Sequence, residues 1–262
     1  MNVFSEIQHY RHLDIEVEVT TLCNFKCPYC CAKTESRKFI SKSDISKLLD
    51  FISPLPLPVT VCITGGEPAL YPHLKYLVSE LDKAPQVDVI EIYTNASKPL
   101  KVESPKLHLL CTWHPKFTLK EVYYANLLKY KGCVEAVPLV MPKYSYTGLQ
   151  EFCSKHGIPV QYEYLRTADK TLLSKSPFKA QARYQLNGRK LSLEDVLKGF
   201  DRFKGWWCEQ SLLTIDTQGN VRNCLGQVGN IFQGRFKYEV HEVQCPKERC
   251  GIDCFLGTLK HD

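Results

Sequence analysis

Three cysteines in the segment CNFKCPYC, residues 23 to 30, have the types and spacing of metal ligands. Cys23, Cys27 and Cys30 follow directly after a β-rich segment. Thiolate sulfur is a ligand that zinc and iron–sulfur clusters prefer. Because three ligands are one too few for a closed structural site, the spacing predicts either a fourth ligand elsewhere or a metal centre with an open position.

Two kinds of metal centre are compatible with this triplet. In a zinc site, Cys31 would be the nearest fourth ligand, although adjacent cysteines rarely both reach one tetrahedral ion. In a four-iron, four-sulfide cluster, three cysteines would leave one iron open to an external ligand, which is the design of a catalytic site. The sequence favours the cluster and keeps zinc as the alternative.

A second group of cysteines lies between residues 205 and 262. The run LLTIDTQGNVRNC has a hairpin signature, with a turn containing glycine between two β-rich runs. We therefore expect Cys208 and Cys224 to lie close together and to bind a second metal centre with two of the three later cysteines. A zinc ribbon with four cysteine ligands is the alternative. The candidate ligands are Cys208, Cys224, Cys245, Cys250 and Cys254.

The elements that position the first triplet alternate between strands and helices. This alternation predicts βαβ units and a parallel sheet, with no full helix in the short connection 96–105. We expect strands at 14–20, 58–64, 87–94, 106–113, 134–141 and 158–165, and helices at 41–52, 71–82, 118–130 and 145–156.

Strand parity predicts which face of this sheet carries polar side chains. Ile15, Val17 and Val19 alternate with Asp14, Glu16 and Glu18 along the first strand. An apolar face must receive the helices, so the polar face would point into a lumen. Six such units with a polar interior predict an α/β fold with a partial (β/α)6 TIM-like barrel, and the triplet then follows the first strand at its carboxyl end.

These motifs resemble those of the radical S-adenosylmethionine (SAM) enzymes. CNFKCPYC is similar to the CxxxCxxC motif of that family, with Tyr29 before the last cysteine, and TGGEP at residues 64–68 is similar to its GGEP motif. The resemblance implies that SAM chelates the open iron of a [4Fe–4S] cluster. It also implies reductive cleavage of SAM to a 5′-deoxyadenosyl radical, with electrons from an external reductant such as flavodoxin or ferredoxin.

The resemblance also implies cofactor contacts. Gly65 and Gly66 would present backbone groups to the ligand, Glu67 would bind the methionyl amine, and Pro68 begins the following segment. Taken alone, GGEP is more typical of a tight turn between a strand and a helix, and only the upstream triplet of cysteines favours the cofactor-binding interpretation.

Three residues at the ends of later strands are further candidates for the cofactor site. Thr94 and Asn95 match a polar position that often approaches the cofactor in the family, and the alternative is a turn closed by the asparagine side chain. His114 could line the site or serve as a structural hydrogen-bonding residue.

The C-terminal segment is similar to the SPASM and twitch domains of the same superfamily. Cys208 is followed by ten residues, Gly219, four residues and Cys224, as in the signature that opens those domains. The resemblance implies one auxiliary [4Fe–4S] cluster, because only five cysteines remain. The spacing of the last three departs from the SPASM pattern, so the spare cysteine is not identified.

Length and composition limit the possible domain organisation and cellular location of the protein. The chain has 262 residues, 44% of them hydrophobic, and a net charge of +6. We expect a core barrel at 1–165, a basic connecting segment at 166–204 and a small cysteine-rich hairpin and helix domain at 205–262. Thirteen clustered cysteines, no secretion signal and no long apolar stretch predict a cytoplasmic protein without a membrane span.

The leading hypothesis is an enzyme that rearranges, epimerises or dehydrogenates a small molecule or a modified nucleobase, possibly in DNA. A peptide-modifying maturase is an alternative, although the first strand begins at Asp14 and leaves little room for a leader-binding domain. An alternative of another class is a zinc module that contacts nucleic acid through the basic segment, where Phe178, Tyr184, Phe200 and Phe203 are interleaved.

Inward-facing side chains are candidates for contact with the substrate. Glu16, Glu18 and Glu163 suggest a substrate with amine or hydroxyl groups, and Glu18 is the candidate catalytic residue among them. The remaining cysteines are expected to be small buried hydrophobic residues. The exception is Cys62, which falls on the polar face of the second strand, where its thiol could return a hydrogen atom to a substrate radical.

Overall fold

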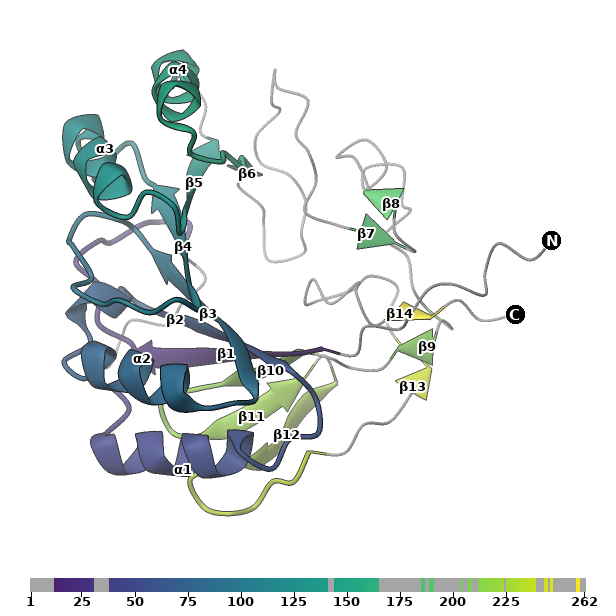
Figure 1. The fold of residues 1–262 in the computed structure, drawn as a ribbon. Helices are drawn as coiled ribbons and strands as arrows, with labels where there is room; N and C mark the ends of the chain where they lie inside the picture. The colour runs from purple at the N-terminus through teal and green to yellow at the C-terminus, as the bar shows by residue number, and fades with distance from the viewer. Residues whose placement is uncertain are drawn as a thin grey trace.

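The structure is a computed structural model whose central feature is a curved, mostly parallel β-sheet (Figure 1). It describes residues 12–30, 38–140, 144–164, 185–186, 189–190, 204, 207–208, 212–223, 225–238, 243–244, 246 and 258–259. The sheet has nine strands in the order β12-β11-β10-β1-β2-β3-β4-β5-β6. Strands β1 to β6 are consecutive in the chain and pair in parallel, as the alternation of strands and helices predicted.

The six predicted strands are present. They are β1 (Leu13–Thr20), β2 (Val59–Gly65), β3 (Val87–Thr94), β4 (Leu107–Trp113), β5 (Val134–Val140) and β6 (Glu163–Tyr164). The last is shorter than the 158–165 predicted, with only a single bridge from Val160 to Ala136 before it. The chain is therefore an α/β protein with a mostly parallel sheet.

The predicted helices are also present, and they cover one face of the sheet (Figure 1). Ser41 caps the first helix by accepting a hydrogen bond from the Asp44 backbone N–H, and Gly157 ends the last with a left-handed φ of 66°. Each helix begins one to three residues later than predicted, and the second is the latest because a 3-10 turn precedes it. The elements are α1 (Lys42–Ile52), η1 (Pro68–Leu70), α2 (Leu74–Lys83), α3 (Lys120–Lys129) and α4 (Thr147–His156).

The two faces of the sheet differ as strand parity predicted. Ile15, Val17 and Val19 have no exposed surface and pack in the core with apolar side chains of the helices. The residues that alternate with them, Asp14, Glu16 and Glu18, are only half-buried. The polar face therefore lies opposite the helical layer.

The C-terminal hairpin forms as predicted, and it joins the main sheet. Strands β10 (Leu212–Ile215) and β11 (Asn220–Asn223) pair antiparallel, and β12 (Gly226–Asn230) follows. Strand β10 lies parallel to β1, with Glu16 opposite Thr214. Residues 212–230 are thus continuous with the sheet of the first six strands, and the division of the chain into three domains stays a prediction.

Short strands account for the other described segments. Strand β7 (Gln185–Leu186) pairs with β8 (Arg189–Lys190), while β9 (Trp207–Cys208) lies between β13 (Val243–Gln244) and β14 (Thr258–Leu259). Within the described parts of the chain, no helix is both long enough and apolar enough to cross a membrane.

Candidate cluster and cofactor site

The cysteine triplet lies in the loop after β1, at the carboxyl edge of the sheet. Cys23 and Cys27 are half-buried and Cys30 is exposed, and all three are free thiols. The loop is partly ordered by its own backbone, because the Cys30 N–H donates to the Cys27 carbonyl (3.1 Å) and the Phe25 N–H donates to the Cys23 sulfur (3.4 Å). The location is the one that parallel α/β sheets use for their sites.

The three thiols of the loop lie near enough to interact electrostatically with one another. Soft thiolates are the ligands that an iron–sulfur cluster needs. Cys31 lies outside the described residues.

The GGEP segment holds the start of the cysteine loop in place. The Gly66 N–H donates to the Thr20 carbonyl and the Glu67 N–H to the Leu22 carbonyl, both at 2.7 Å. A Cβ atom would lie 2.2 Å from the Thr20 oxygen at Gly65, and 2.2 Å from the Leu22 oxygen at Gly66. Both glycines are therefore required by the close approach of the chain that leads into Cys23.

The Glu67 carboxylate is buried at the junction of β2 and β3. It is 1% exposed and accepts hydrogen bonds from the Thr94 hydroxyl (2.6 Å), the Asn95 N–H (2.8 Å) and the Ala69 N–H (2.9 Å). Burial raises its pKa, and the three donors oppose that rise. Three of the roughly four acceptor positions of the carboxylate are thus already used within the protein.

Two polar residues that no sequence pattern marks, Asn24 and Ser97, extend this network into the cysteine loop. The Asn95 amide donates to the Asn24 side-chain oxygen (3.1 Å), and Asn24 donates to the Ser97 hydroxyl (2.9 Å). Ser97 in turn donates to the Asn95 side-chain oxygen (2.6 Å). Asn24 lies inside the CxxxCxxC motif, but its partners lie about 70 residues away, so no local pattern marks the contact.

Aromatic side chains pack on the other side of the triplet. Tyr29 stacks on His114, with ring centroids 5.9 Å apart and its hydroxyl 3.1 Å from His114 Nδ1. The same nitrogen lies 3.9 Å from the Cys27 sulfur. Burial lowers the pKa of His114 to about 4, so its ring is neutral near neutral pH. Phe25, which sequence reasoning did not single out, contacts His114 edge to face and stacks on Phe117.

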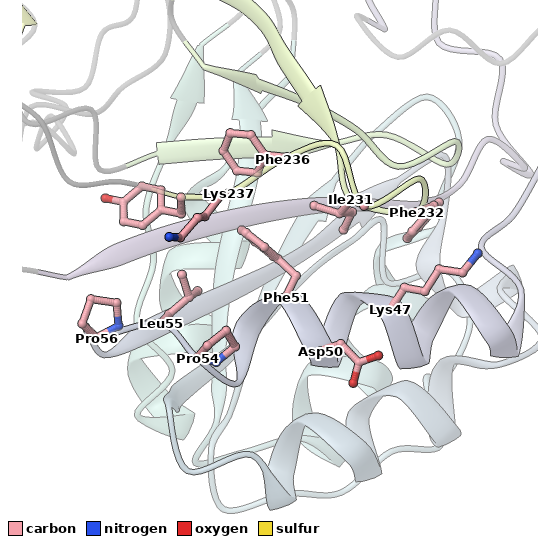
Figure 2. A pocket seen from close by; sticks show the side chains of 12 residues that line it. Lys47, Asp50, Phe51, Pro54, Leu55, Pro56, Ile231, Phe232, Phe236 and Lys237 are labelled. Carbon is pink, nitrogen blue, oxygen red and sulfur yellow. The ribbon is translucent and has the colours of Figure 1, made fainter.

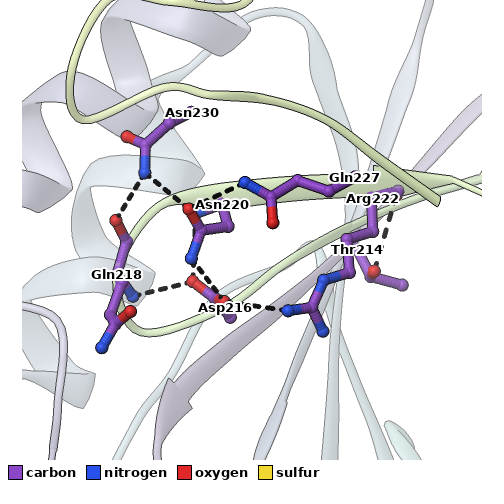
Figure 3. Close-up of polar contacts among 7 residues, drawn as sticks. All are labelled: Thr214, Asp216, Gln218, Asn220, Arg222, Gln227 and Asn230. Atoms are coloured by element: carbon purple, nitrogen blue, oxygen red, sulfur yellow. Dashed lines mark hydrogen bonds and ion pairs between the residues drawn. The ribbon is translucent and has the colours of Figure 1, made fainter.

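The predicted inward residues lie on one polar face. Glu16 accepts a hydrogen bond from Thr64 (3.1 Å), and burial raises the pKa of both Glu16 and Glu18. Asp216 raises the pKa of Glu18 further, whereas Arg222 opposes the shift. The hairpin of β10 and β11 thus brings Asp216 and Arg222 to the polar face beside Glu18, as Figure 3 shows for their ion pair.

The other predicted cysteines are only partly described. Cys62, Cys111 and Cys153 are buried and Cys133 is half-buried. Cys208 lies in β9, where only its backbone is described, and the side chain of Glu163 is likewise not described. The remaining auxiliary ligands lie outside the described residues: Cys224, Cys245, Cys250 and Cys254.

A cavity of about 490 Å³ lies away from these residues, between α1 and the segment after β12 (Figure 2). Phe51, Leu55, Phe236 and Tyr238 contribute to its lining. None of the residues predicted to bind a cofactor or metal lines it, so it is not part of the candidate site.

Comparison with known proteins identifies the N-terminal segment. Residues 17–106 match the family described as the Radical SAM superfamily. A GTP 3′,8-cyclase of Clostridium acetobutylicum is 37% identical over 93 residues, which are 34% of this chain and 29% of that protein. A second, of Psychromonas ingrahamii, is 32% identical over 85 residues, or 31% of this chain and 25% of that protein. The chain thus spans less than a third of the length of these relatives.

Two solved structures show the same fold over most of the chain. SuiB of Streptococcus suis, bound to the precursor peptide SuiA, has a TM-score of 0.59 at 16% identity. The match covers 94% of this chain and 64% of the SuiB chain. Native anSMEcpe with bound AdoMet and the Cp18Cys peptide has a TM-score of 0.55 at 13% identity, and the match covers 84% of this chain and 77% of that chain. The hydrogen bonds from the GGEP segment to the start of the cysteine loop agree with the sequence match to the Radical SAM superfamily. That match shows that residues 17–106 form a radical SAM domain, the domain of a superfamily of enzymes.

Proposed function

We propose that this chain is a radical SAM enzyme in which Cys23, Cys27 and Cys30 hold a [4Fe–4S] cluster with SAM at its open iron. The observation that carries the proposal is the pair of backbone hydrogen bonds by which Gly66 and Glu67 hold the loop that leads into Cys23. When bound, the cluster and SAM supply a 5′-deoxyadenosyl radical that abstracts hydrogen from the substrate. An external one-electron reductant such as flavodoxin or ferredoxin would supply the electron.

The residues around the triplet have separate roles in this proposal. Tyr29 and His114 form a pair of nearly parallel aromatic rings beside the cysteines, and such rings are suited to packing against the adenine of SAM. Gly65, Gly66 and Pro68 shape the backbone at the carboxyl edge of β2. Glu67, with Thr94 and Asn95, fixes that backbone and leaves one acceptor position for the methionyl amine.

We further propose a partial (β/α)6 barrel for residues 1–165, a basic connecting segment at 166–204 and a twitch-like domain at 205–262. One auxiliary [4Fe–4S] cluster would be held there by Cys208, Cys224 and two of Cys245, Cys250 and Cys254. The consecutive parallel order of β1 to β6 supports the barrel, and the antiparallel β10–β11 hairpin supports the start of the small domain. A cytoplasmic location stays a prediction.

The polar face of the sheet supports a substrate with amine or hydroxyl groups. Asp14, Glu16 and Glu18 lie half-buried on it, where carboxylates bind such groups through charge-assisted hydrogen bonds. Rearrangement, epimerisation or dehydrogenation of a small molecule or a modified nucleobase remains the proposed reaction class. The named relatives are GTP 3′,8-cyclases, but they match only about a third of this chain.

The iron and sulfide content of anaerobically purified protein tests the proposal directly. Wild type should contain about eight irons, and a Cys23→Ala/Cys27→Ala/Cys30→Ala variant about four. Cys153→Ala is a matched control, because Cys153 is a buried free thiol of α4. Wild type and the control should form 5′-deoxyadenosine from SAM with dithionite, and the triple variant should form none. Zinc in place of iron, or no 5′-deoxyadenosine from fully loaded wild type, would contradict the proposal.

A further inference from the structure

Four side chains form a row across the polar face of the sheet, below the cysteine loop. Cys62, Glu91, His108 and Glu135 come from four neighbouring strands, β2 to β5. The strand register places Cys62 opposite Glu91, and Glu91 opposite His108. On β5, Glu135 lies opposite Leu110, which comes two residues after His108 on β4 and so points to the same face. Parallel pairing thus brings together residues that are far apart in the sequence.

The contacts connect the four groups in order. The Cys62 thiol donates to Glu91 Oε2 at a sulfur–oxygen distance of 3.5 Å. The other oxygen of Glu91 lies 3.2 Å from His108 Nδ1. The second ring nitrogen of His108 lies 3.9 Å from Glu135 Oε2. Cys62, Glu91 and His108 are thus linked at hydrogen-bond distance, and Glu135 lies at ion-pair distance from the other ring nitrogen of His108.

Exposure increases from the thiol toward the imidazole. Cys62 is 9% exposed, whereas the side chains of Glu91 and His108 are 17% and 39% exposed. His108 is thus the most exposed of the four groups and has the best access to solvent protons, while the Glu135 side chain is 20% exposed. Cys62 is also three residues before Gly65, which at a rise of about 3.3 Å per residue puts it about 10 Å below the cysteine loop.

Its surroundings keep Cys62 in the thiol form. Burial raises the pKa of Cys62 far above its usual range, and the nearby carboxylates of Glu91, Asp14 and Glu16 raise it further. A thiol of this kind is a poor nucleophile and a poor metal ligand, because both roles need the thiolate. It retains its S–H bond, which is the bond that a carbon radical can break.

We propose that Cys62 is a hydrogen-atom donor on the inner face of the sheet, and that Glu91 and His108 position its thiol and return a proton to it from solvent. The donor role rests on the proposed radical chemistry, whereas the chain of contacts does not. Glu91 is a positioning residue in this arrangement, because it acts through Cys62.

The step balances in atoms and electrons. A carbon radical of the bound substrate takes the hydrogen atom of Cys62, so a C–H bond forms, the S–H bond breaks and a thiyl radical remains. One electron from the external one-electron reductant converts the thiyl to a thiolate. A proton that passes from solvent through His108 and Glu91 then restores the thiol.

The first test does not require the cluster. Iodoacetamide labelling of Cys62 at alkaline pH, followed by mass spectrometry, reports the thiolate fraction of that residue in folded protein. Glu91→Gln removes a negative charge beside the thiol and should raise the labelling rate several-fold. Glu80→Gln is the matched control, because Glu80 pairs with Lys83 on α2, and it should leave the rate unchanged. An unchanged rate in Glu91→Gln would overturn the role of Glu91.

The second test uses cluster-loaded protein in D2O, where the thiol carries deuterium. If Cys62 reaches the radical site, 5′-deoxyadenosine formed with dithionite in the absence of substrate should contain deuterium at its 5′ carbon. Cys62→Ser should reduce that deuterium several-fold, since an O–H bond is too strong to give up its hydrogen atom. Cys133→Ser is the control and should match wild type, because Cys133 lies in the loop before β5.

The outcomes separate the two proposals. Equal deuterium in wild type and Cys62→Ser would overturn the donor role while leaving the radical SAM proposal intact. No 5′-deoxyadenosine from any loaded protein would instead overturn the proposed function, and with it the donor role. The labelling experiment would still report on the contact between Cys62 and Glu91.

Discussion

At the scale of single residues, the GGEP motif has a structural role that its ligand-binding interpretation does not require. Gly65 and Gly66 pass so close to the end of β1 that a side chain has no room, and Glu67 accepts three internal hydrogen bonds. These contacts connect the ends of three strands to the cysteine loop. The motif therefore positions the loop that carries the three cysteines, whatever else it binds.

We expect Gly66→Ala to destabilise the protein by about 1–3 kcal/mol, because the new methyl group would overlap the Leu22 carbonyl. The displaced loop should also lower the iron content of the reconstituted protein. Gly157→Ala is the control: its Cβ meets nothing within 4 Å, so only the left-handed backbone costs energy, about 1 kcal/mol. Urea unfolding and iron analysis measure both effects. Full iron content in Gly66→Ala would contradict the positioning role.

Glu16 provides a prediction about pH. Burial raises its pKa in the folded protein, so the folded state binds more protons than the unfolded state and loses stability as pH rises above the usual range of a glutamate. Glu16→Gln should therefore be more stable than wild type at neutral pH, by about 1.4 kcal/mol for each unit of the pKa shift. The difference should vanish in acid. Urea unfolding at several pH values tests this, and a variant equally destabilised at every pH would contradict it.

At the scale of elements, the hairpin of β10 and β11 depends on its turn. Asp216 accepts hydrogen bonds from the Gln218 N–H (2.9 Å), the Asn220 N–H (3.0 Å) and the Asn220 side chain (2.9 Å), as part of the network in Figure 3. Gly219, with φ of 79°, completes the turn in a backbone conformation that favours glycine. The turn thus fixes the register that carries Arg222 to the polar face.

Asp216→Ala should loosen this hairpin without unfolding the rest of the sheet. Three donors would lose their acceptor, at a cost of about 1–3 kcal/mol. Hydrogen exchange should become faster in β10 to β12 and stay slow in β2 and β3. Asp88→Ala, at an exposed position of β3, is the matched control. Uniformly faster exchange across the whole sheet would contradict a local role.

At the scale of the whole molecule, the nine-stranded sheet combines β1 to β6 with β10, β11 and β12, which come from a much later part of the chain. Strand β1 has β2 on one side and β10 on the other, so residues 212–215 cover what would otherwise be an edge of the sheet. Leu213 and Ile215 also contribute buried side chains to the main core. Residues 212–215 are therefore part of the scaffold of the site.

Truncation tests this dependence. A chain of residues 1–204 should lose cooperative unfolding and tend to aggregate, because β1 becomes an exposed edge strand. Residues 1–238, which keep β10 to β12, should unfold cooperatively. Calorimetry and light scattering on both chains provide the comparison. Cooperative unfolding of residues 1–204 would instead favour the core at 1–165 as an independent domain.

The local chemistry could be predicted from the sequence alone. The CxxxCxxC triplet, the order of six strands and four helices, and the apolar face of Ile15, Val17 and Val19 depend on residue types and short periodicities, which are printed in the sequence. The hairpin of residues 212–223 was equally predictable, because its turn residues are adjacent.

Contacts between distant segments were decided only by the tertiary structure. The parallel pairing of β10 with β1, the network that joins Asn24 to Asn95 and Glu67, and the chain from Cys62 to Glu135 each connect residues from different strands or loops. Strand register across a sheet depends on how whole elements pack, and no local period of the sequence encodes it. The sequence by itself thus determined the candidate groups of the cysteine loop and the GGEP segment, and packing decided which partners these groups meet.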